Sequence, residues 1–439
     1  GCIYQVDPEG QNWELIGTGF RNEYDAAVNR HGDLFSYDAD MEWDVNTPWY
    51  RPTRVCLVSS GAEFGWRNGA GKWPAYHPDS LPAVVNVGPG SPTGIAFGYG
   101  AKFPAKYQEA LFICDWSYGK LYAVHLEPSG AAYTGTLEEF VAGSPLPLTD
   151  VVIQPADGAL YFTIGGRRTK SGLYRVTYAG AESTETSKSA DTPVTAEARA
   201  LRRKLESFHG RRDPAAIATA WPHLKSEDRF LRYAARTAIE HQDVASWQDL
   251  ALRETNPQAA VSALLALARA GGSDPFHRKP DSPPVDAALR GKLLKSLSLL
   301  DWNKLSIGQR IELLRVYHVA LNRLGPPTDV EREQITKHLD PHFPSNAREV
   351  NSELAQLLVY LQAPSAAAKT VKLLTTAPTQ EEQIDLARAL RMLRTGWNPE
   401  LRKTYFEWFL KAASYKGGAS FGLFVENIKR DAIETLTDA

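Results

Sequence analysis

Cysteine is scarce in this sequence, with Cys2, Cys56 and Cys114 as its three examples in 439 residues. They form no CxxC or CxxCH motif, so this stretch shows neither a zinc ribbon nor a c-type haem attachment site. Three cysteines are also too few for a disulfide framework. The simplest role for them is as small apolar residues in strands, with one disulfide pair as the alternative. The cysteines therefore leave the cellular compartment open.

Long apolar runs and an excess of one charge are missing as well. No run of about 18 apolar residues occurs, so no segment is expected to span a membrane. Lys and Arg number 49 and Asp and Glu number 51, a net charge of −2. Nucleic-acid binding relies on a strong local excess of cations, so nucleic acid is excluded as the main partner. The sequence opens with GCIYQVDPEG, which reads as a strand and its turn, and we expect the chain to begin inside a longer protein.

Composition divides the sequence near residue 180. Of the 33 glycines, 22 precede residue 179, as do 13 of the 18 tyrosines, whereas the later part is rich in Leu, Ala and Arg. Residues 179–197 (AGAESTETSKSADTPVTAE) show no hydrophobic pattern and are typical of a flexible linker. We therefore expect a β-rich domain over 1–178 and an α-helical domain over 198–439.

Short units recur within residues 1–178. A G-(x)-L/I-Y-x-V pattern appears at 1–6, 119–124 and 172–176. A longer unit starts at Asp25 and again at Asp150, where the aspartate opens an apolar strand and a glycine turn leads to an L-[FY] strand. Turns that recur about every 50 residues favour β-propeller blades, which stack because one sheet cannot bury both its faces. A β-sandwich is the alternative.

Residues 198–439 carry apolar side chains at helical spacing. In SEDRFLRYAARTAIEHQ (226–242), Leu231, Ala235 and Ile239 share one stripe, which we expect to be buried between neighbouring helices. Repeated helices with short loops favour an α-solenoid, whose surface is a candidate site for other proteins. The basic run Arg202-Arg203-Lys204 is interpreted as a solvated face.

Several motifs resemble those of the soluble glucose/sorbosone dehydrogenase propellers. They follow in the order seen in that family: an R-N pair in GTGFRNEYDAAVNRHGDLFSYDADMEWD, a G-x-x-[FY]-G-W element in SSGAEFGWRNG, and a P-[ST]-G strand in SPTGIAFGYGAKFPAKYQEALFICDWSYGKLYAV. Together with DRFLRYAARTAIEHQ, ALRMLRTGWNPELRKTYFEWF and YKGGASF, nearly the whole chain is similar to the planctomycete-type membrane-bound dehydrogenases. The resemblance implies a six-bladed-type propeller, an all-α HEAT-like solenoid, a haem-binding CxxCH cytochrome c domain, and a periplasmic or cell-envelope location.

The resemblance also implies that this chain is an internal piece. Residues 1–178 are long enough for about three of the six blades, so we expect a partial, open propeller. The catalytic histidine of the family belongs to an earlier blade, and no histidine here matches its motif. The haem c domain is expected in a missing C-terminal part. Oxidation of a sugar or alcohol, with electrons passed to that haem, would then belong to the full-length protein, and the chain alone is expected to be inactive.

The resemblance supplies the candidate site residues. Arg21 and Asn22 match the R-N pair, in which the arginine contacts pyrroloquinoline quinone (PQQ). A permanently charged guanidinium can stabilise a developing quinol oxyanion. The alternative is an arginine bonded to the carbonyls of a neighbouring blade. Thr93 of the P-[ST]-G strand, and Asp115 with Trp116 after the next strand, are further candidates for the cofactor pocket.

One departure from the family concerns the quinone. Family members that bind it carry R-x-R-D where this sequence has Pro147-Leu-Thr-Asp150, and only the aspartate is retained. An anionic cofactor needs a cationic partner for each charge once it is desolvated. The sequence therefore leaves open a rival function, in which a propeller–solenoid scaffold binds carbohydrate or protein without catalysis.

An acidic loop is the candidate metal site. Asp38, Asp40 and Glu42 place oxygen ligands at the density that suits Ca²⁺, and the resembling enzymes hold calcium near this position. The alternative is that these acids pair with Arg51 and Arg54 just downstream.

Overall fold

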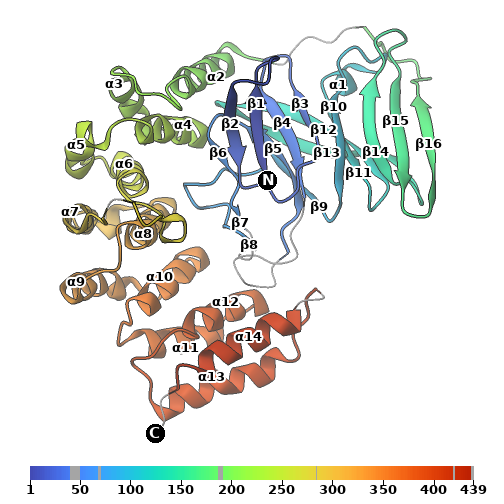
Figure 1. Ribbon diagram of the computed structural model, residues 1–439. Coiled ribbons are helices and arrows are strands. Elements are labelled where there is room, and N and C mark those ends of the chain that lie inside the picture. The colour runs from blue at the N-terminus through green and yellow to red at the C-terminus, as the bar shows by residue number, and fades with distance from the viewer. Residues whose placement is uncertain (40–49, 68–70, 186–190, 283, 419–420, 437–439) are drawn as a thin grey trace. The chain divides into compact units, whose positions relative to one another are not determined.

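Figure 1 shows the computed structural model, which describes residues 1–39, 50–67, 71–185, 191–282, 284–418 and 421–436. The described residues form two compact units. Tyr76–Pro78 and the residues from Ser207 onward make up the second unit, and the other residues before Ser207 make up the first. The first unit is built mainly from strands and the second from helices, as the composition of the two halves predicts.

Three antiparallel sheets form most of the first unit. One sheet joins β3 (Ala26–Val28), β4 (Leu34–Asp38), β5 (Thr53–Val58) and β9 (Val85–Gly88). A second joins β10 (Pro92–Phe97), β11 (Leu111–Asp115), β12 (Lys120–Ser129) and β13 (Ala132–Ala142). A third joins β14 (Leu148–Ile153), β15 (Leu160–Gly166) and β16 (Thr169–Val176).

Smaller elements complete this unit. β1 (Cys2–Val6) pairs with β2 (Trp13–Thr18), which also pairs in parallel with β6 (Ala62–Glu63), and β7 (Trp66–Arg67) pairs with β8 (Gly71–Lys72). The short helix α1 (Ala105–Gln108) lies between β10 and β11 in the chain. Helix α2 (Pro193–Glu206) begins within the segment whose composition is typical of a linker.

The first strands of the three larger sheets lie side by side. β10 contacts β3 on one side and β14 on the other. The sheets therefore stack face to face instead of merging into one sheet, as blades of a propeller do. The aspartates that open the longer repeat are both at the first strand of a sheet: Asp25 directly precedes β3 and Asp150 lies in β14. The repeat in the sequence therefore marks where a sheet begins. The pairings among the described strands close no ring.

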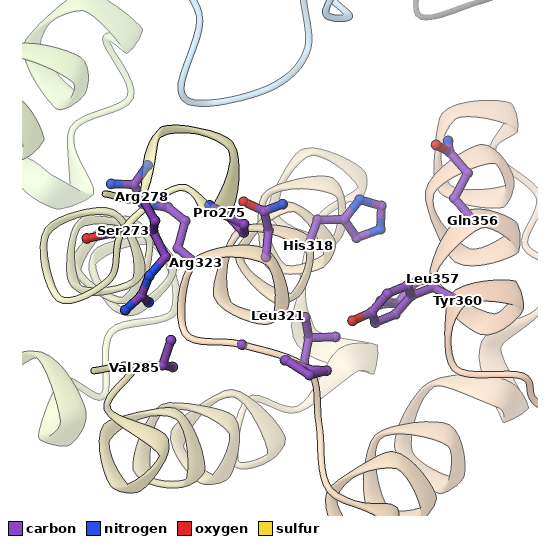
Figure 2. Close-up of a pocket in the computed structure, with 13 residues that line it drawn as sticks. Ser273, Pro275, Arg278, Val285, His318, Leu321, Arg323, Gln356, Leu357 and Tyr360 are labelled. Carbon is purple, nitrogen blue, oxygen red and sulfur yellow. The ribbon is translucent and has the colours of Figure 1, made fainter. Parts of the chain in front are cut away.

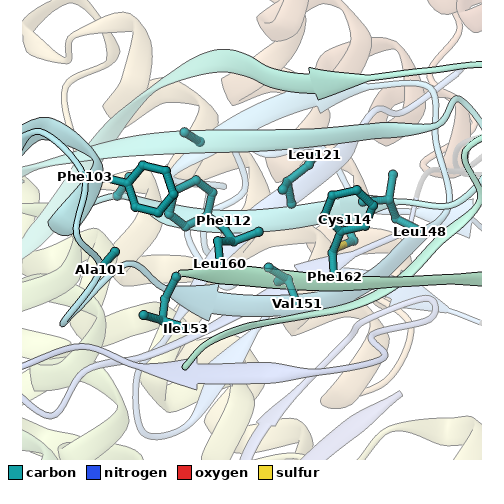
Figure 3. Packing of buried hydrophobic residues seen from close by; sticks show 12 residues of the cluster. Ala101, Phe103, Phe112, Cys114, Leu121, Leu148, Val151, Ile153, Leu160 and Phe162 are labelled. Carbon is teal, nitrogen blue, oxygen red and sulfur yellow. The ribbon is translucent and has the colours of Figure 1, made fainter. Parts of the chain in front are cut away.

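A well-packed core fills the space between the second and third sheets (Figure 3). Its buried side chains come mainly from β11, β12, β14 and β15: Ala101, Phe103, Ala110, Phe112, Cys114, Leu121, Ala123, Leu148, Val151, Ile153, Leu160 and Phe162. Cys114 is therefore a core residue, and Cys56 is buried too, as the sequence predicts. None of the three cysteines is in a disulfide.

Helices follow one another through the second unit. They are α3 (Ala216–Ala220), α4 (Arg229–Glu240), α5 (Gln248–Arg253), α6 (Pro257–Ala270), α7 (Ala287–Ser298), α8 (Ile307–Arg323), α9 (Asp329–Leu339), α10 (Arg348–Tyr360), α11 (Ala366–Thr376), α12 (Gln380–Leu390), α13 (Pro399–Ala412) and α14 (Phe421–Ile433). Short 3-10 turns separate some of them: η1 (Trp221–Lys225), η2 (Val244–Ser246), η3 (Pro275–His277), η4 (Trp302–Lys304) and η5 (Asp340–His342).

In this unit, many helices pack against the helix two places further along the chain. α4, α6, α8, α10, α12 and α14 form one continuous row, and α5, α7 and α9 form a second row beside part of it. Contacts that run between near neighbours in the chain are typical of solenoids. In the part of the chain that the structure describes, no helix is both long enough and apolar enough to cross a lipid bilayer.

The apolar stripe of α4 is buried as predicted. Leu231 is 8% exposed, and Ala235 and Ile239 are fully buried. Asp228 caps the start of the helix, because its side chain accepts hydrogen bonds from the backbone N–H groups of Phe230 and Leu231. Such a bond is typical of an N-terminal cap. The start of α4 and the position of its apolar stripe can therefore both be predicted from the sequence.

Helix α2 belongs to the first unit and is attached through its basic residues. Arg202 is 2% exposed and bonds to the carboxylate of Asp33, which is itself 4% exposed. Arg203 donates to the same carboxylate oxygen over 3.0 Å, and the hydroxyl of Tyr133 donates to the other oxygen over 2.6 Å. The prediction of a solvated face is therefore wrong for Arg202, because this run anchors the helix to the sheets.

Candidate functional site

The loop that carries the R-N pair is held by a buried carboxylate. Asp38, the last residue of β4, is fully buried. One of its oxygens, Oδ1, accepts hydrogen bonds from the backbone N–H groups of Arg21 (2.9 Å) and Asn22 (3.1 Å). The other oxygen, Oδ2, accepts two from the guanidinium of Arg54, from Nε at 3.2 Å and Nη2 at 3.1 Å. The backbone at the R-N pair is therefore fixed to β4 and β5.

The sequence offers two roles for Asp38, as a calcium ligand with Asp40 and Glu42 or as the partner of an arginine. The pairing with Arg54 is present. Asp40 and Glu42 lie outside the described residues. Among the described residues, no group of three or more His, Cys, Asp or Glu side chains is arranged to hold a metal ion. The calcium site stays a prediction.

We expect Asp38→Asn to loosen the backbone of Arg21 and Asn22. The amide keeps an acceptor oxygen but loses its charge, and hydrogen bonds to charged groups contribute about 1.5–3 kcal/mol each. Amide hydrogen exchange followed by NMR should show that these two N–H groups lose protection by about tenfold or more. The matched control is Asp7→Asn in an exposed turn, which should leave both amides unchanged. Equal protection in Asp38→Asn and the parent would contradict the proposed role.

Thr93 and Trp116 both connect the second sheet to the third. The hydroxyl of Thr93 lies 2.9 Å from the carbonyl oxygen of Leu148 and 3.3 Å from that of Cys114. The indole N–H of Trp116 donates to the carbonyl of Gly165 over 2.7 Å. Each of these two predicted cofactor residues thus makes a structural bond between neighbouring sheets.

Asp115, another predicted cofactor residue, is fully buried at the end of β11. Its Oδ1 accepts backbone hydrogen bonds from Ser91 and Ser117, both at 2.9 Å. These bonds tie the segment before β10 to the turn after β11. The structure therefore brings Thr93, Asp115 and Trp116 together around β10 and β11, whereas Arg21 and Asn22 are tied to the first sheet.

The two aspartates that open the repeats connect one sheet to the next, a role that the sequence left unassigned. Oδ2 of Asp25, just before β3, accepts a hydrogen bond over 3.1 Å from the N–H of Ile95 on β10. Asp150 on β14 lies against Gly94 of β10. A Cβ atom at Gly94 would lie 2.4 Å from Oδ1 of Asp150 and 2.5 Å from its Cα, so a side chain there would push the two strands apart.

Asp25 and Asp150, together with Asp115, affect the pKa of the buried thiol of Cys114. Burial raises the pKa of this thiol well above its ordinary value, and the negative charges of Asp150, Asp25 and Asp115 raise it further. Asp25 and Asp150 meet β10 at the adjacent residues Ile95 and Gly94, and Asp115 lies opposite Pro92 of the same strand. This part of the site is acidic, which disfavours bound anions and favours cations or hydrogen-bond donors.

Two cations that the family resemblance leads one to expect around an anionic quinone are missing from the described residues of this region. Of the two positions where the resembling family carries arginines, one holds the buried Pro147 and the other holds Thr149. The Thr149 hydroxyl lies 2.8 Å from that of Thr163. A desolvated polyanion needs cationic partners, and the neighbouring carboxylates are of the wrong sign.

Comparisons with known proteins give partial similarities. No protein-family model and no curated protein matches the chain. A Thermus thermophilus protein described as an oxidoreductase (glucose dehydrogenase) is 21% identical, over 37% of this chain and 47% of its own, with a TM-score of 0.30. The PQQ-bound aldose sugar dehydrogenase of Streptomyces coelicolor is 16% identical, over 40% of this chain and 51% of its own, with a TM-score of 0.31. The chain spans about half the length of each structure.

Proposed function

We propose that the first unit is part of a dehydrogenase-type propeller and that the full-length protein oxidises a sugar or a related alcohol. The observation that carries this proposal is the loop of Arg21 and Asn22, whose N–H groups are bonded to the buried Asp38. A buried ion pair such as Asp38–Arg54 adds little net stability, so positioning of the loop is a better reason for it. A guanidinium at a fixed backbone position suits stabilisation of a developing oxyanion.

The proposal includes the parts that the family resemblance implies. They are a six-bladed ring, a HEAT-like solenoid, a haem domain that accepts the electrons, and a periplasmic or cell-envelope location. The stacking of β3, β10 and β14 supports the propeller, and the row of alternate helices supports the solenoid. An incomplete ring would leave Arg21 in water, where its charge has little effect on a reaction. We therefore expect the chain alone to be inactive.

PQQ and Ca²⁺ enter this proposal as the cofactors of the resembling enzymes. Asp25, Asp115 and Asp150 place negative charge beside β10, so we derive no step of the reaction through the quinone. The same observation favours the second candidate, a scaffold that binds carbohydrate without catalysis. Carboxylates accept hydrogen bonds from sugar hydroxyls, and such a neutral ligand needs no cationic partner.

Dye reduction by the full-length protein, supplied with PQQ and Ca²⁺ and offered a panel of sugars and alcohols, tests the proposal. We expect turnover of at least one substrate, and a loss of about 10²–10³-fold in kcat for Arg21→Ala, the range for removal of one oxyanion-stabilising group. The matched control is Arg168→Ala, which replaces an exposed arginine of the same unit and should leave the rate unchanged.

Two outcomes would separate the candidates. If no substrate is turned over and titration shows no bound quinone, the enzyme proposal fails. Binding of a sugar, measured by calorimetry under the same conditions, would then support the scaffold. If neither turnover nor sugar binding is found, both candidates fail.

A further inference from the structure

A pocket of about 710 Å³ lies within the helical unit (Figure 2). Its walls come from α8, from α10, from the segment that precedes α7 and from the loop that follows α8. Pockets of 300–1,000 Å³ with mostly apolar walls and a few polar groups are the usual sites for small molecules. This volume is too large for a water-filled packing defect and falls within the range of a drug-sized ligand.

The walls of the pocket are mainly apolar. Leu321 of α8 and Leu357 of α10 face it from two helices, and Pro275 and Val285 contribute from the segment before α7. Tyr360, which is 48% exposed, stands at the end of α10. Because apolar surface in a concave site favours transfer of an apolar group out of water, the ligand should contain a hydrocarbon portion.

One side of the pocket is cationic. Figure 2 shows Arg278 and Arg323 together on the side opposite Gln356 and Tyr360. Arg323 is held in place, because its Nε donates to the carbonyl of Arg269 over 3.1 Å and its Nη2 to that of Gly272 over 2.9 Å. A preorganised guanidinium loses less entropy when it binds a carboxylate.

Among the described residues that line the pocket, Arg278 and Arg323 supply two guanidinium groups on this side. Asp274 is near Arg323, but it already accepts hydrogen bonds from Nδ1 of His277 (2.9 Å) and from the N–H of Phe276 (3.0 Å). His318, on the other side, lies 3.6 Å from Glu353. Burial lowers the pKa of the His318 imidazole, and the charge of Glu353 opposes this shift.

We propose that this pocket binds a small amphipathic anion, a carboxylate on a hydrocarbon chain. The hydrocarbon lies along Leu321 and Leu357, and the carboxylate lies against Arg278 and Arg323. Arginine suits this role because its guanidinium forms paired hydrogen bonds with a carboxylate. This site lies within the helical unit and does not depend on the dehydrogenase proposal.

Isothermal titration calorimetry with decanoate, kept below its micelle concentration, tests the inference. Decan-1-ol serves as the uncharged probe. We expect decanoate to bind at one site and at least tenfold more tightly than decan-1-ol. Arg278→Gln should weaken decanoate binding at least tenfold and leave decan-1-ol unchanged. The matched control is Arg212→Gln, an exposed arginine of the same unit, which should change neither affinity.

A second variant locates the ligand. Asn322 lies on the exposed rim of the pocket, so Asn322→Trp should fill the pocket without disturbing the buried core. Both probes should then lose at least tenfold in affinity. The inference is overturned if neither probe binds the parent, if the two probes bind equally, or if Asn322→Trp binds decanoate as the parent does.

Discussion

Asp33→Ala is expected to destabilise the first unit by about 3–5 kcal/mol, the range for breaking a buried ion pair. The carboxylate of Asp33 is shared by Arg202, Arg203 and the hydroxyl of Tyr133. Without it, Glu206, 3.2 Å from Nε of Arg202, would be the acid left to this buried guanidinium among the described residues. We therefore expect α2 to detach or the whole unit to unfold more readily.

Amide hydrogen exchange can show where the stability is lost in this variant. Protection should fall in α2 and in the sheets of the first unit, and it should stay unchanged in α6 and α8 of the second unit. Arg203→Gln is the milder control, because Arg203 is about half exposed and removal of its charge leaves no buried partner alone. An unchanged exchange pattern in Asp33→Ala would contradict the anchoring role of this carboxylate.

The effect of Asp33→Ala should also depend on pH. Burial raises the pKa of the Asp33 carboxyl, but the charge of Arg202, the hydrogen bond from Tyr133 and the contacts with Arg203 outweigh it, so the pKa lies below the ordinary 3.8. A carboxyl with a lowered folded-state pKa contributes stability above its unfolded-state pKa and loses it as pH falls through the folded value. The difference in the free energy of unfolding between Asp33→Ala and the parent should therefore be largest near pH 7 and shrink below about pH 4.

Ala235→Glu is expected to destabilise the second unit by several kcal/mol. Ala235 is fully buried on α4, so a glutamate there would be an unpaired charge in a packed seam between helices. Buried charges without a partner cost about 3–5 kcal/mol, and the extra volume adds to this. Chemical denaturation followed by far-ultraviolet circular dichroism should show the helical transition shifted to lower denaturant concentration.

Ala288→Glu is the matched control for this substitution. Ala288 is exposed in the first turn of α7, where a negative charge is favourable toward the helix dipole. The control should change stability by less than about 0.5 kcal/mol. Similar losses in both variants would show that the substitution acts through helix propensity, and the proposed packing of α4 would then be wrong.

Features that depend on neighbours in the sequence could be predicted from it. The stripe of Leu231, Ala235 and Ile239 follows from helical periodicity, and the positions of Asp25 and Asp150 follow from the repeat. The pairing of Asp38 with Arg54 was predicted as the alternative to a calcium site, and the two residues lie directly opposite each other on β4 and β5. Cross-strand neighbours of opposite charge are a usual feature of antiparallel sheets.

Features that depend on distant contacts could not be predicted in the same way. Arg202 is 169 residues from Asp33 in the chain, and its basic neighbours gave it the pattern of a surface helix. The candidate cofactor residue Thr93 bonds to Leu148, 55 residues away, only because two sheets stack. The pocket beside α8 has no sequence signal, since its walls come together only when separate helices and loops pack.

The placement of the cysteines gives the folded chain a useful selectivity toward thiol-directed reagents. Alkylation requires an accessible thiolate. Cys56 and Cys114 are both fully buried, and the pKa of Cys114 is raised by burial and by the neighbouring carboxylates. Cys2 is the exposed member of the three. A fluorescent dye or a spin label can therefore be attached at the start of β1 of the native sequence, without first removing the other two thiols.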